Sequence, residues 1–266
     1  MQQTLLLKAL PGGRLFYCLL LCLLSPLAAQ AAPLCPPSHI DRQVQVRYVH
    51  DGDTLHLKSG EKVRLIGLNT PEVARKGRPN DPLAIRARDR LRQLVTASQN
   101  RLGLRLDSEP FDRYGRRLAH LYSQDGSSLS AQLLKEGLAT LLAVPPNLAG
   151  LDCYAEAEYQ ARQSGSGIWQ LQQYQLVTSL ELARNARGYR RVTGEVIRIG
   201  EGRRNLWLNL PGRVALRIDK TELSLFSELK PRELLGKKVI GRGWLYEHKG
   251  ELRMRLRSPY ALEILP

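Results

Sequence analysis

The 266-residue sequence has only four cysteines, and none belongs to a C-x-x-C motif or to a cluster with histidine. A protein zinc site usually needs such closely spaced ligands, so the sequence argues against one. The five histidines are scattered, and His50 and His56 fit strand positions better than roles as ligands or bases. The apolar run from Leu15 to Leu24 is shorter than the roughly 20 residues of a membrane-spanning helix.

The first 31 residues instead have the pattern of a secretory signal peptide. Lys8 and Arg14 precede the short apolar run, and Ala29-Gln30-Ala31 matches a cleavage site. We expect a mature chain that is periplasmic or secreted, with an uncleaved anchor as the alternative. Cleavage would leave Cys35 and Cys153, an even pair that can form one disulfide in an oxidising compartment. Two unrelated buried thiols are the alternative, because sequence spacing does not establish the Cα separation that a bridge requires.

Positive charge is concentrated in the last third of the chain. The whole sequence has a net charge of +15; residues 32–178 carry +4, and residues 179–266 carry +9 from 19 basic and 10 acidic residues. A strongly basic module suggests a polyanionic partner, because Lys and Arg that neutralise phosphates release counterions. A basic face that serves solubility, or that rests on an anionic membrane, is the alternative.

Hydrophobic periodicity predicts an α+β fold, mainly β, with two barrels. Residues 32–178 show five short strands with helices between and after them, which fits a five-stranded Greek-key OB barrel. The expected strands are 44–49, 55–57, 62–66, 102–106 and 118–122, and the expected helices run from the cap Asn80 to Ser98, from the cap Ser128, and through Tyr154 to Gln163.

Residues 170–188 are predicted to be a linker or a connecting helix, and residues 179–266 a second, smaller OB-like barrel. Its expected strands are 192–199, 206–210, 214–218, 239–246 and 251–256, with a short helical insert at 231–235. In the last strand region Arg253, Arg255 and Arg257 alternate, which predicts three guanidinium groups on one face.

Residues 51–72 hold the groups best suited to chemistry. Asp51-Gly52-Asp53-Thr54 forms a predicted hairpin turn, and Asn69-Thr70-Pro71-Glu72 follows the strand after it. Later in the chain, Asp112-Arg113-Tyr114-Gly115-Arg116 precedes the fifth strand. Loops that leave a rigid sheet are where binding and catalytic groups are often found.

These motifs, in this order, resemble the staphylococcal nuclease (thermonuclease) family from about residue 44 to residue 169. The resemblance implies an OB fold and Ca²⁺-dependent hydrolysis of nucleic acid. It implies catalytic roles for Arg64, Glu72 and Arg116, metal ligands at Asp53, Asn69 and Thr70, and substrate contacts at Arg113 and Tyr114.

The residue types suit these roles. Arginine donates bidentately to phosphate and stays charged, a glutamate can orient or deprotonate water, and Asp53 is a hard oxygen ligand for Ca²⁺. Singly, each has an ordinary explanation: a turn-forming aspartate, a surface ion pair at Arg64 or a helix start at Thr70-Pro71-Glu72. Their joint occurrence on a basic, secreted chain favours an active site.

Two departures from the family pattern limit what carries over. Asn69 stands where the family has an aspartate ligand, so we expect weaker metal binding. The tyrosines that follow the family's G-L-A segment are missing after Gly137-Leu138-Ala139, so base preference does not carry over.

We therefore predict a secreted or periplasmic Ca²⁺-dependent endonuclease of DNA, with RNA left open, whose C-terminal module binds nucleic acid. A non-catalytic nucleic-acid-binding protein is the main alternative, and a protein that binds an envelope polymer through its second barrel is another. A pure binder needs the basic surface but not the acidic pair Asp53 and Glu72, which favours the enzyme. We expect no membrane span after signal cleavage and no obligate protein partner.

Overall fold

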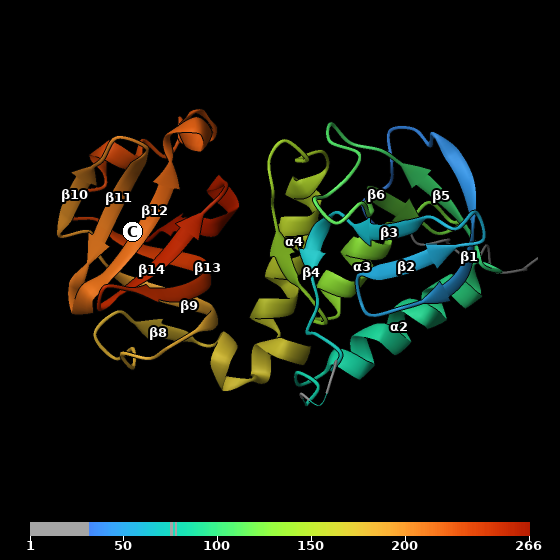
Figure 1. Ribbon diagram of the computed structural model, residues 1–266, viewed down its shortest axis with the longest axis horizontal. Coiled ribbons are helices and arrows are strands. Elements are labelled where there is room, and N and C mark those ends of the chain that lie inside the picture. Colours follow the sequence, from blue (N-terminus) through green and yellow to red (C-terminus); the bar gives the residue numbers. More distant parts are fainter. Residues whose placement is uncertain (1–31, 75–76, 78) are drawn as a thin grey trace, which may run out of the picture. The chain divides into compact units, whose positions relative to one another are not determined.

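Five strands close into a barrel in the computed structural model (Figure 1). The structure describes residues 32–74, 77 and 79–266, so the predicted signal peptide lies outside the described residues. The barrel strands are β1 (Arg42–Val49), β2 (Thr54–Leu57), β3 (Lys62–Leu65), β5 (Arg101–Arg105) and β6 (Arg117–Tyr122). They are ordered β1-β2-β3-β6-β5, with β3 and β6 parallel and the other neighbours antiparallel. The predicted five-stranded OB barrel is confirmed.

The helices α2 (Ala84–Ala97), α3 (Leu129–Lys135) and α4 (Leu151–Gln163) follow the predicted order. Leucines and alanines from all three helices enter the same buried cluster as the barrel interior. Ser128 caps α3, because its Oγ accepts a hydrogen bond from Ala131 N at 3.3 Å. None of these helices, nor any other among the described residues, is long and apolar enough to cross a membrane.

Asn80 does not cap α2, so that prediction was wrong. The helix begins at Ala84, and Asn80 Oδ1 accepts instead from Ala74 N at 2.7 Å. Asp81 Oδ2 likewise accepts from Glu72 N at 3.0 Å. Short polar side chains can bond to a nearby loop as readily as to a helix start, and here they stabilise the corner that carries Glu72.

A two-stranded sheet, which the sequence did not predict, joins β4 (Gly67–Asn69) to β7 (Thr140–Leu142). The two strands are antiparallel, with Asn69 opposite Thr140. Strands of three residues are too short to give a hydrophobic period. Their pairing fixes the backbone of Asn69 next to the exit from β3.

Cys35 and Cys153 form a disulfide, with 5.7 Å between their Cα atoms. The bond joins the segment before β1 to α4 and spans 118 residues of sequence. The expected pairing is therefore confirmed, and the two cysteines are not separate thiols.

Replacing both cysteines by serine should lower the free energy of unfolding by about 2–5 kcal/mol, because the long loop no longer restricts the unfolded chain. Urea unfolding followed by circular dichroism would measure the change. Wild-type protein unfolded with a reductant present is the matched control and should show a similar loss. An unchanged unfolding midpoint in both would contradict the prediction.

The second sheet has eight strands, where five were predicted. The predicted strand at 192–199 is split into two, and short strands are added at the edges of the sheet. The eight are β8 (Leu176–Thr178), β9 (Gly188–Glu195), β10 (Arg198–Glu201), β11 (Asn205–Leu210), β12 (Val214–Asp219), β13 (Lys238–His248), β14 (Glu251–Leu256) and β15 (Leu262–Ile264). The helical insert expected at 231–235 is a single 3-10 turn, Pro231–Glu233.

The split strand gives this sheet the arrangement of the first barrel. Residues 188–201 pair through β9 with β13 and through β10 with β11, so one segment bonds to both ends of the order β11-β12-β14-β13. The parallel pair β12 and β14 holds the place of β3 and β6. This is the strand order expected for a second OB-like barrel.

The predicted linker is packed structure, not a connecting α-helix. Two 3-10 turns, Gly167–Gln170 and Gln172–Tyr174, lead into β8. The Trp169 and Tyr174 rings lie 5.8 Å apart, and Tyr174 lies 5.3 Å from Tyr189 of β9. These buried rings tie the segment to both α4 and the second sheet.

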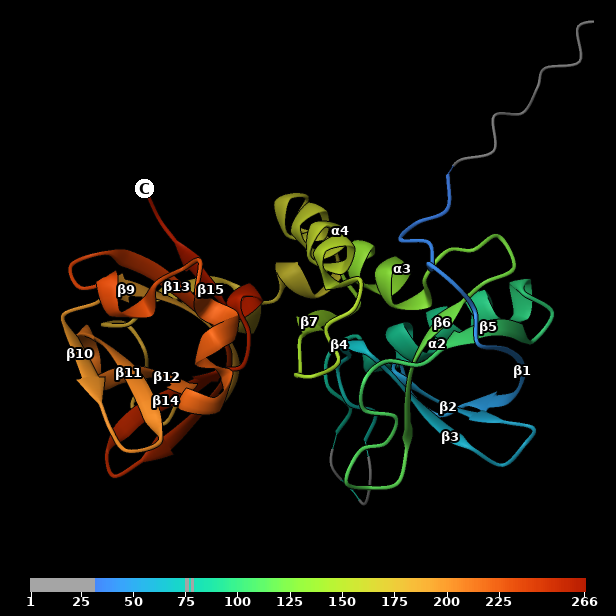
Figure 2. The same cartoon turned by 90° about the horizontal axis from the view of Figure 1, so that it is seen from above.

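Residues 33–266 make one compact unit, within which α4 lies between the first barrel and the second sheet (Figures 1 and 2). Glu158 of α4 and Arg242 of β13 form an ion pair there, with exposed fractions of 0% and 8%. Tyr260 OH donates to Asp152 Oδ1 at 2.6 Å, and Arg162 Nη1 donates to Glu263 Oε1 at 2.9 Å. These contacts fix the second sheet against the helix.

Candidate active site

Asp53 connects the separate parts of the site. It directly precedes β2, is 5% exposed, and its Oδ2 is 3.1 Å from Arg64 Nη2. The same oxygen accepts hydrogen bonds from Thr70 N at 3.2 Å and from Thr70 Oγ1 at 3.1 Å. A Cβ on Gly52 would lie 2.7 Å from the Thr70 side chain, so the turn can approach Thr70 only with glycine there. The D-G-D-T turn thus positions a carboxylate and does not only reverse the chain.

Arg64 is held from several sides inside the protein. It lies on β3 opposite Thr54 and is 9% exposed. Besides its contact with Asp53, its Nη1 donates to Leu65 O at 3.0 Å and its Nη2 donates to Asn69 Oδ1 at 3.1 Å. The ordinary explanation, an exposed surface ion pair, therefore does not hold for Arg64.

Arg116 reaches the same carboxylate through a hydroxyl group. Its Nη1 donates to Thr54 Oγ1 at 3.4 Å, and Thr54 Oγ1 donates to Asp53 Oδ1 at 3.0 Å. Asp112 orients the arginine, because its Oδ2 accepts from Arg116 Nε at 2.7 Å. Burial alone would raise the pKa of Asp112, but hydrogen bonds from Arg116 and Tyr114, with the Arg116 charge, together outweigh burial and lower the pKa.

Glu72, Arg113 and Tyr114 lie on the exposed side of the site. The backbone N–H of Glu72 donates to Asp81, which fixes the backbone at Glu72. The Glu72 side chain lines a cleft that Asp53 and Arg64 also line. Tyr114 is 68% exposed, with the guanidinium carbon of Arg113 4.8 Å from its ring centroid and that of Arg116 5.6 Å away. Tyr114 thus presents a ring face between two positive charges.

A cleft of about 840 Å³ brings most of the predicted residues together. Its lining includes Asp53, Arg64, Asn69, Glu72, Tyr114 and Arg116. Thr70 is buried behind it against Asp53, and Arg113 lines a neighbouring hollow. The structure therefore groups six of the eight predicted residues in one cleft and places the other two beside it.

Sequence reasoning missed a part of this cleft. Asp51 is buried, and its Oδ1 accepts from Asp53 N at 3.2 Å. Burial and then the neighbouring Asp53 charge raise the pKa of Asp51. Two aspartates that flank one glycine in a tight turn were a signal for a joint role, but only Asp53 was given one.

His50 and His56 also line the cleft, which their strand positions did not predict. A register shift between Val46 and Tyr48 brings Tyr48 opposite His56, and the two rings stack with centroids 4.3 Å apart. Burial and then Lys62 lower the pKa of His56. This side of the cleft thus presents the His56 imidazole, which stacks on Tyr48 behind it and has a lowered pKa.

The oxygen atoms around Asp53 fit a hard divalent cation. The buried carboxylates of Asp51 and Asp53 lie side by side, and burial together with the Asp53 charge raises the pKa of Asp51. A bound cation would stabilise the negative charge of both carboxylates. Asn69 and Thr70 add neutral oxygens. Across residues 32–74, 77 and 79–266, no group of three or more His, Cys, Asp or Glu side chains is placed to hold a metal ion. A cation here would be held by two carboxylates together with neutral oxygens.

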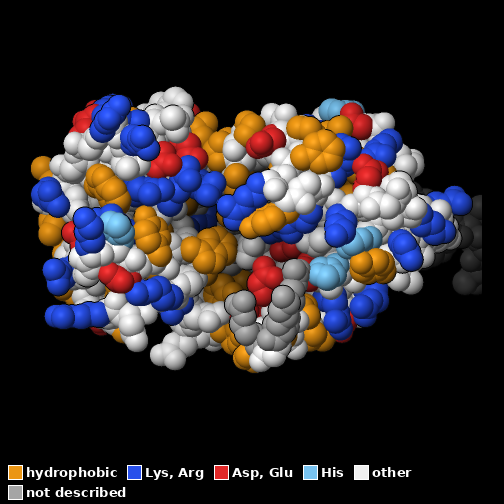
Figure 3. All heavy atoms as spheres, viewed as in Figure 1, with side chains coloured by type: hydrophobic (Ala, Val, Ile, Leu, Met, Phe, Trp, Pro, Cys, Tyr) orange, Lys and Arg blue, Asp and Glu red, His pale blue; other side chains and the backbone are white. Residues whose placement is uncertain are grey.

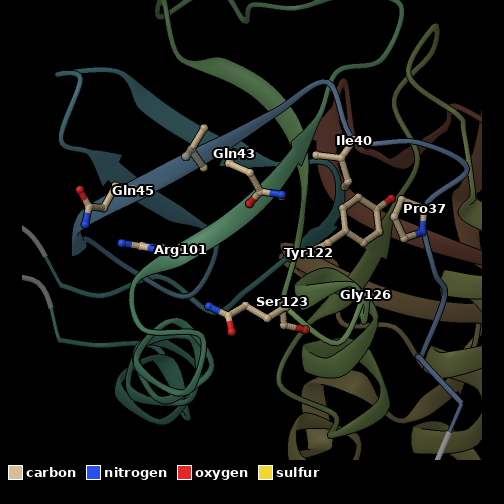
Figure 4. Close-up of a pocket in the computed structure, with 11 residues that line it drawn as sticks. Pro37, Ile40, Gln43, Gln45, Arg101, Tyr122, Ser123 and Gly126 are labelled. Carbon is tan, nitrogen blue, oxygen red and sulfur yellow. The ribbon is translucent and has the colours of Figure 1, made fainter.

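Another hollow, of about 630 Å³, lies against β1 and β5 (Figure 4). Among the described residues that line it, Arg101 is the charged one, and glutamines and Tyr122 make up much of the rest. Without a carboxylate it cannot supply the chemistry of the first cleft, so the candidate site is the cleft around Asp53.

Known proteins are similar to this chain over about half of its length. The family described as "Staphylococcal nuclease homologue" matches residues 62–171. The thermonuclease of Staphylococcus intermedius is 36% identical over 128 residues, which cover 47% of this chain and 74% of that protein. The thermonuclease of Staphylococcus hyicus is 32% identical over 132 residues, covering 48% and 76%. Endonuclease YncB of Bacillus subtilis (strain 168) is 36% identical over 124 residues, covering 45% and 57%.

Proposed function

We propose, on the premise that this chain belongs to the staphylococcal nuclease family, that its cleft hydrolyses phosphodiester bonds inside DNA strands with Ca²⁺ as the cofactor. Membership makes the chain a nuclease of the hydrolase class. One observation supports the site most strongly. Arg64 contacts the Asp53 carboxylate directly, and Arg116 reaches it through Thr54, in a cleft that Glu72 also lines.

The two arginines would bind the phosphate that is attacked. Negative charge grows on its oxygens as the bond to phosphorus forms, and preoriented guanidinium groups stabilise that charge without reorganising. Asp112 bonds to Arg116 and Asp53 bonds to Arg64, so each guanidinium group is oriented before substrate binds. Tyr114 and Arg113 would contact the substrate at the mouth of the cleft.

Glu72 would act on the water. Its carboxylate would accept a proton as the water oxygen attacks phosphorus, and the bond from phosphorus to the sugar oxygen would break, with that oxygen taking up a proton from solvent water. Asp53, Asn69 and Thr70 would hold Ca²⁺, with Asp51 beside them. The bound cation supplies positive charge that polarises the phosphate.

The disulfide supports a secreted or periplasmic location. Bonds between cysteines persist in oxidising compartments and are rare in the bacterial cytosol. A signal peptide over residues 1–31 would deliver the chain there.

Digestion of plasmid DNA and of RNA by purified mature protein, with Ca²⁺ or with EDTA, tests this function. We expect internal cleavage of DNA with Ca²⁺ and none with EDTA. The digestion of RNA under the same conditions decides whether RNA is a second substrate. Nucleic acid that is bound but never cleaved would favour the non-catalytic alternative. Full activity in EDTA would exclude the cation.

Asn69→Asp should lower the Ca²⁺ concentration for half-maximal activity about tenfold, because affinity follows ligand charge. The wild type should need Ca²⁺ near the extracellular range of about 10⁻⁴–10⁻³ M. Activity measured across a Ca²⁺ titration would show the shift. Gln43→Glu is a matched control, since it adds the same charge in the hollow of Figure 4. An equal Ca²⁺ requirement in wild type and Asn69→Asp would remove Asn69 from the ligand set.

A further inference from the structure

A hollow of about 890 Å³ adjoins the active-site cleft and runs onto the second sheet. Asn69, Tyr114 and Arg116 line both spaces, so the two are continuous. We call this hollow the arginine groove. Its far side is formed by outward-facing residues of β12, β13 and β14.

Positive charge in the arginine groove is only partly neutralised. Arg217 and Arg255 both pair with Asp219, at 3.0 and 2.7 Å. Arg255 also pairs with Glu222 at 2.8 Å, while its Nε is buried and, within the described part of the chain, has no hydrogen-bond partner. Arg257 lies beside them, and burial followed by the like charge of Arg255 lowers its pKa. A groove in which guanidinium groups crowd and repel one another is suited to a polyanion.

Aromatic rings are exposed along the same groove. Trp244 is 41% exposed and is held edge-on against the buried Tyr189, with 5.3 Å between ring centroids. Tyr246 accepts a hydrogen bond from Arg217, and Tyr114 and Phe111 line the side nearer the active site. Figure 3 shows Lys and Arg side chains gathered around a hollow on this face, with hydrophobic side chains at its edge. Exposed rings beside arginines offer faces on which nucleic-acid bases can stack.

We propose that the arginine groove binds a single strand of nucleic acid that continues out of the active-site cleft, with its bases stacked on Trp244 and Tyr114 and its phosphates on Arg257 and Arg113. The inference rests on the proposed function and adds the substrate form. Proteins that bind single strands combine a basic groove with aromatic stacking platforms. A duplex keeps its bases paired inside and offers no ring face to Trp244.

Binding by the full chain, measured in EDTA so that no cleavage occurs, tests the groove. The probe is a labelled DNA single strand of about 20 nucleotides, a length above the usual site size of one OB fold, beside the matched duplex. Trp244→Ala should weaken single-strand binding about 5- to 100-fold through lost stacking. Arg257→Gln should flatten the slope of log affinity against log salt by about 0.7, the value for one phosphate contact on a single strand.

Arg203→Gln is the matched control, because Arg203 is an exposed arginine in the turn between β10 and β11 that does not line the groove. It should bind the single strand as the wild type does. Arg257→Gln should not lower the thermal midpoint, since it removes a repelled charge, so its binding loss cannot come from unfolding.

Wild-type affinity for the single strand in both Trp244→Ala and Arg257→Gln would overturn the proposal, and so would a duplex bound as tightly as the single strand. The nuclease function has a separate readout. A wild-type chain that cleaves plasmid in Ca²⁺ while the groove variants bind normally overturns the groove alone. A chain that binds through the groove but never cleaves overturns the proposed function alone.

Discussion

Glu72→Gln should lower the rate of DNA cleavage at saturating Ca²⁺ by at least about 10²-fold, the usual contribution of a general base. The amide keeps the size of the side chain and the backbone hydrogen bond to Asp81, so the corner should stay folded. Substrate affinity measured in EDTA should change far less than the rate. That split between binding and turnover is expected of a group that acts on water and not of one that only holds the loop.

Arg64→Lys and Arg116→Lys should each reduce the rate by about 10²–10³-fold, because an ammonium group cannot donate bidentately to phosphate. Arg117→Lys is the matched control. Arg117 follows Arg116 directly but pairs with Glu61 at 2.6 Å and lines neither the cleft nor the arginine groove. Initial rates on plasmid DNA, with circular dichroism to confirm folding, would measure all three variants. Wild-type rates in Glu72→Gln and in both cleft lysine variants would remove the catalytic assignment.

The local parts of this site could be predicted from the sequence because they depend on short spacing. A turn with Asp53, a strand with Arg64 and a strand exit with Glu72 lie within a span of about 20 residues, and period-two alternation orders the strands. Their convergence with Arg116 follows from the parallel pairing of β3 and β6, a feature of the barrel. Family resemblance supplied that step, which periodicity alone could not.

What the sequence could not give depends on contacts between distant segments. The burial of Asp51 and the pairing of β4 with β7 exist only once the barrel is closed. The predicted row of three arginines on one face shows the same limit. Arg253 pairs with Glu251 at 2.9 Å, and Arg255 pairs with Asp219 and with Glu222. The partners of Arg255 lie across or beyond neighbouring strands, where only register brings them close, so sequence counting overstated the charge open to phosphates.

Breaking the buried ion pair of Glu158 and Arg242 should have the second large effect, a loss of folding stability. Glu158 Oε1 also accepts from Leu141 N on β7 at 2.6 Å, so one carboxylate links the second sheet to the strand that pairs with Asn69. Burial alone would lower the pKa of Arg242, but the Glu158 charge and hydrogen bond, together with Tyr189 and Glu263, outweigh burial and raise it. Removing residues after Thr178 would therefore leave Glu158 without its main partner, which makes truncation a poor test of the second sheet's role.

Arg242→Met should lower the free energy of unfolding by about 3–5 kcal/mol, the cost of leaving a buried charge without its partner. Arg162, whose Nε is 4.0 Å from Glu158, can offset only a part of this loss. The double variant with Glu158→Gln should regain a part of the stability, because the amide oxygen still accepts from Leu141 N and neither replaced side chain carries a charge. Urea unfolding of wild type, both single variants and the double variant gives the coupling energy directly. Additive losses in the double variant would show that the two side chains act independently and that the second sheet is held by other contacts.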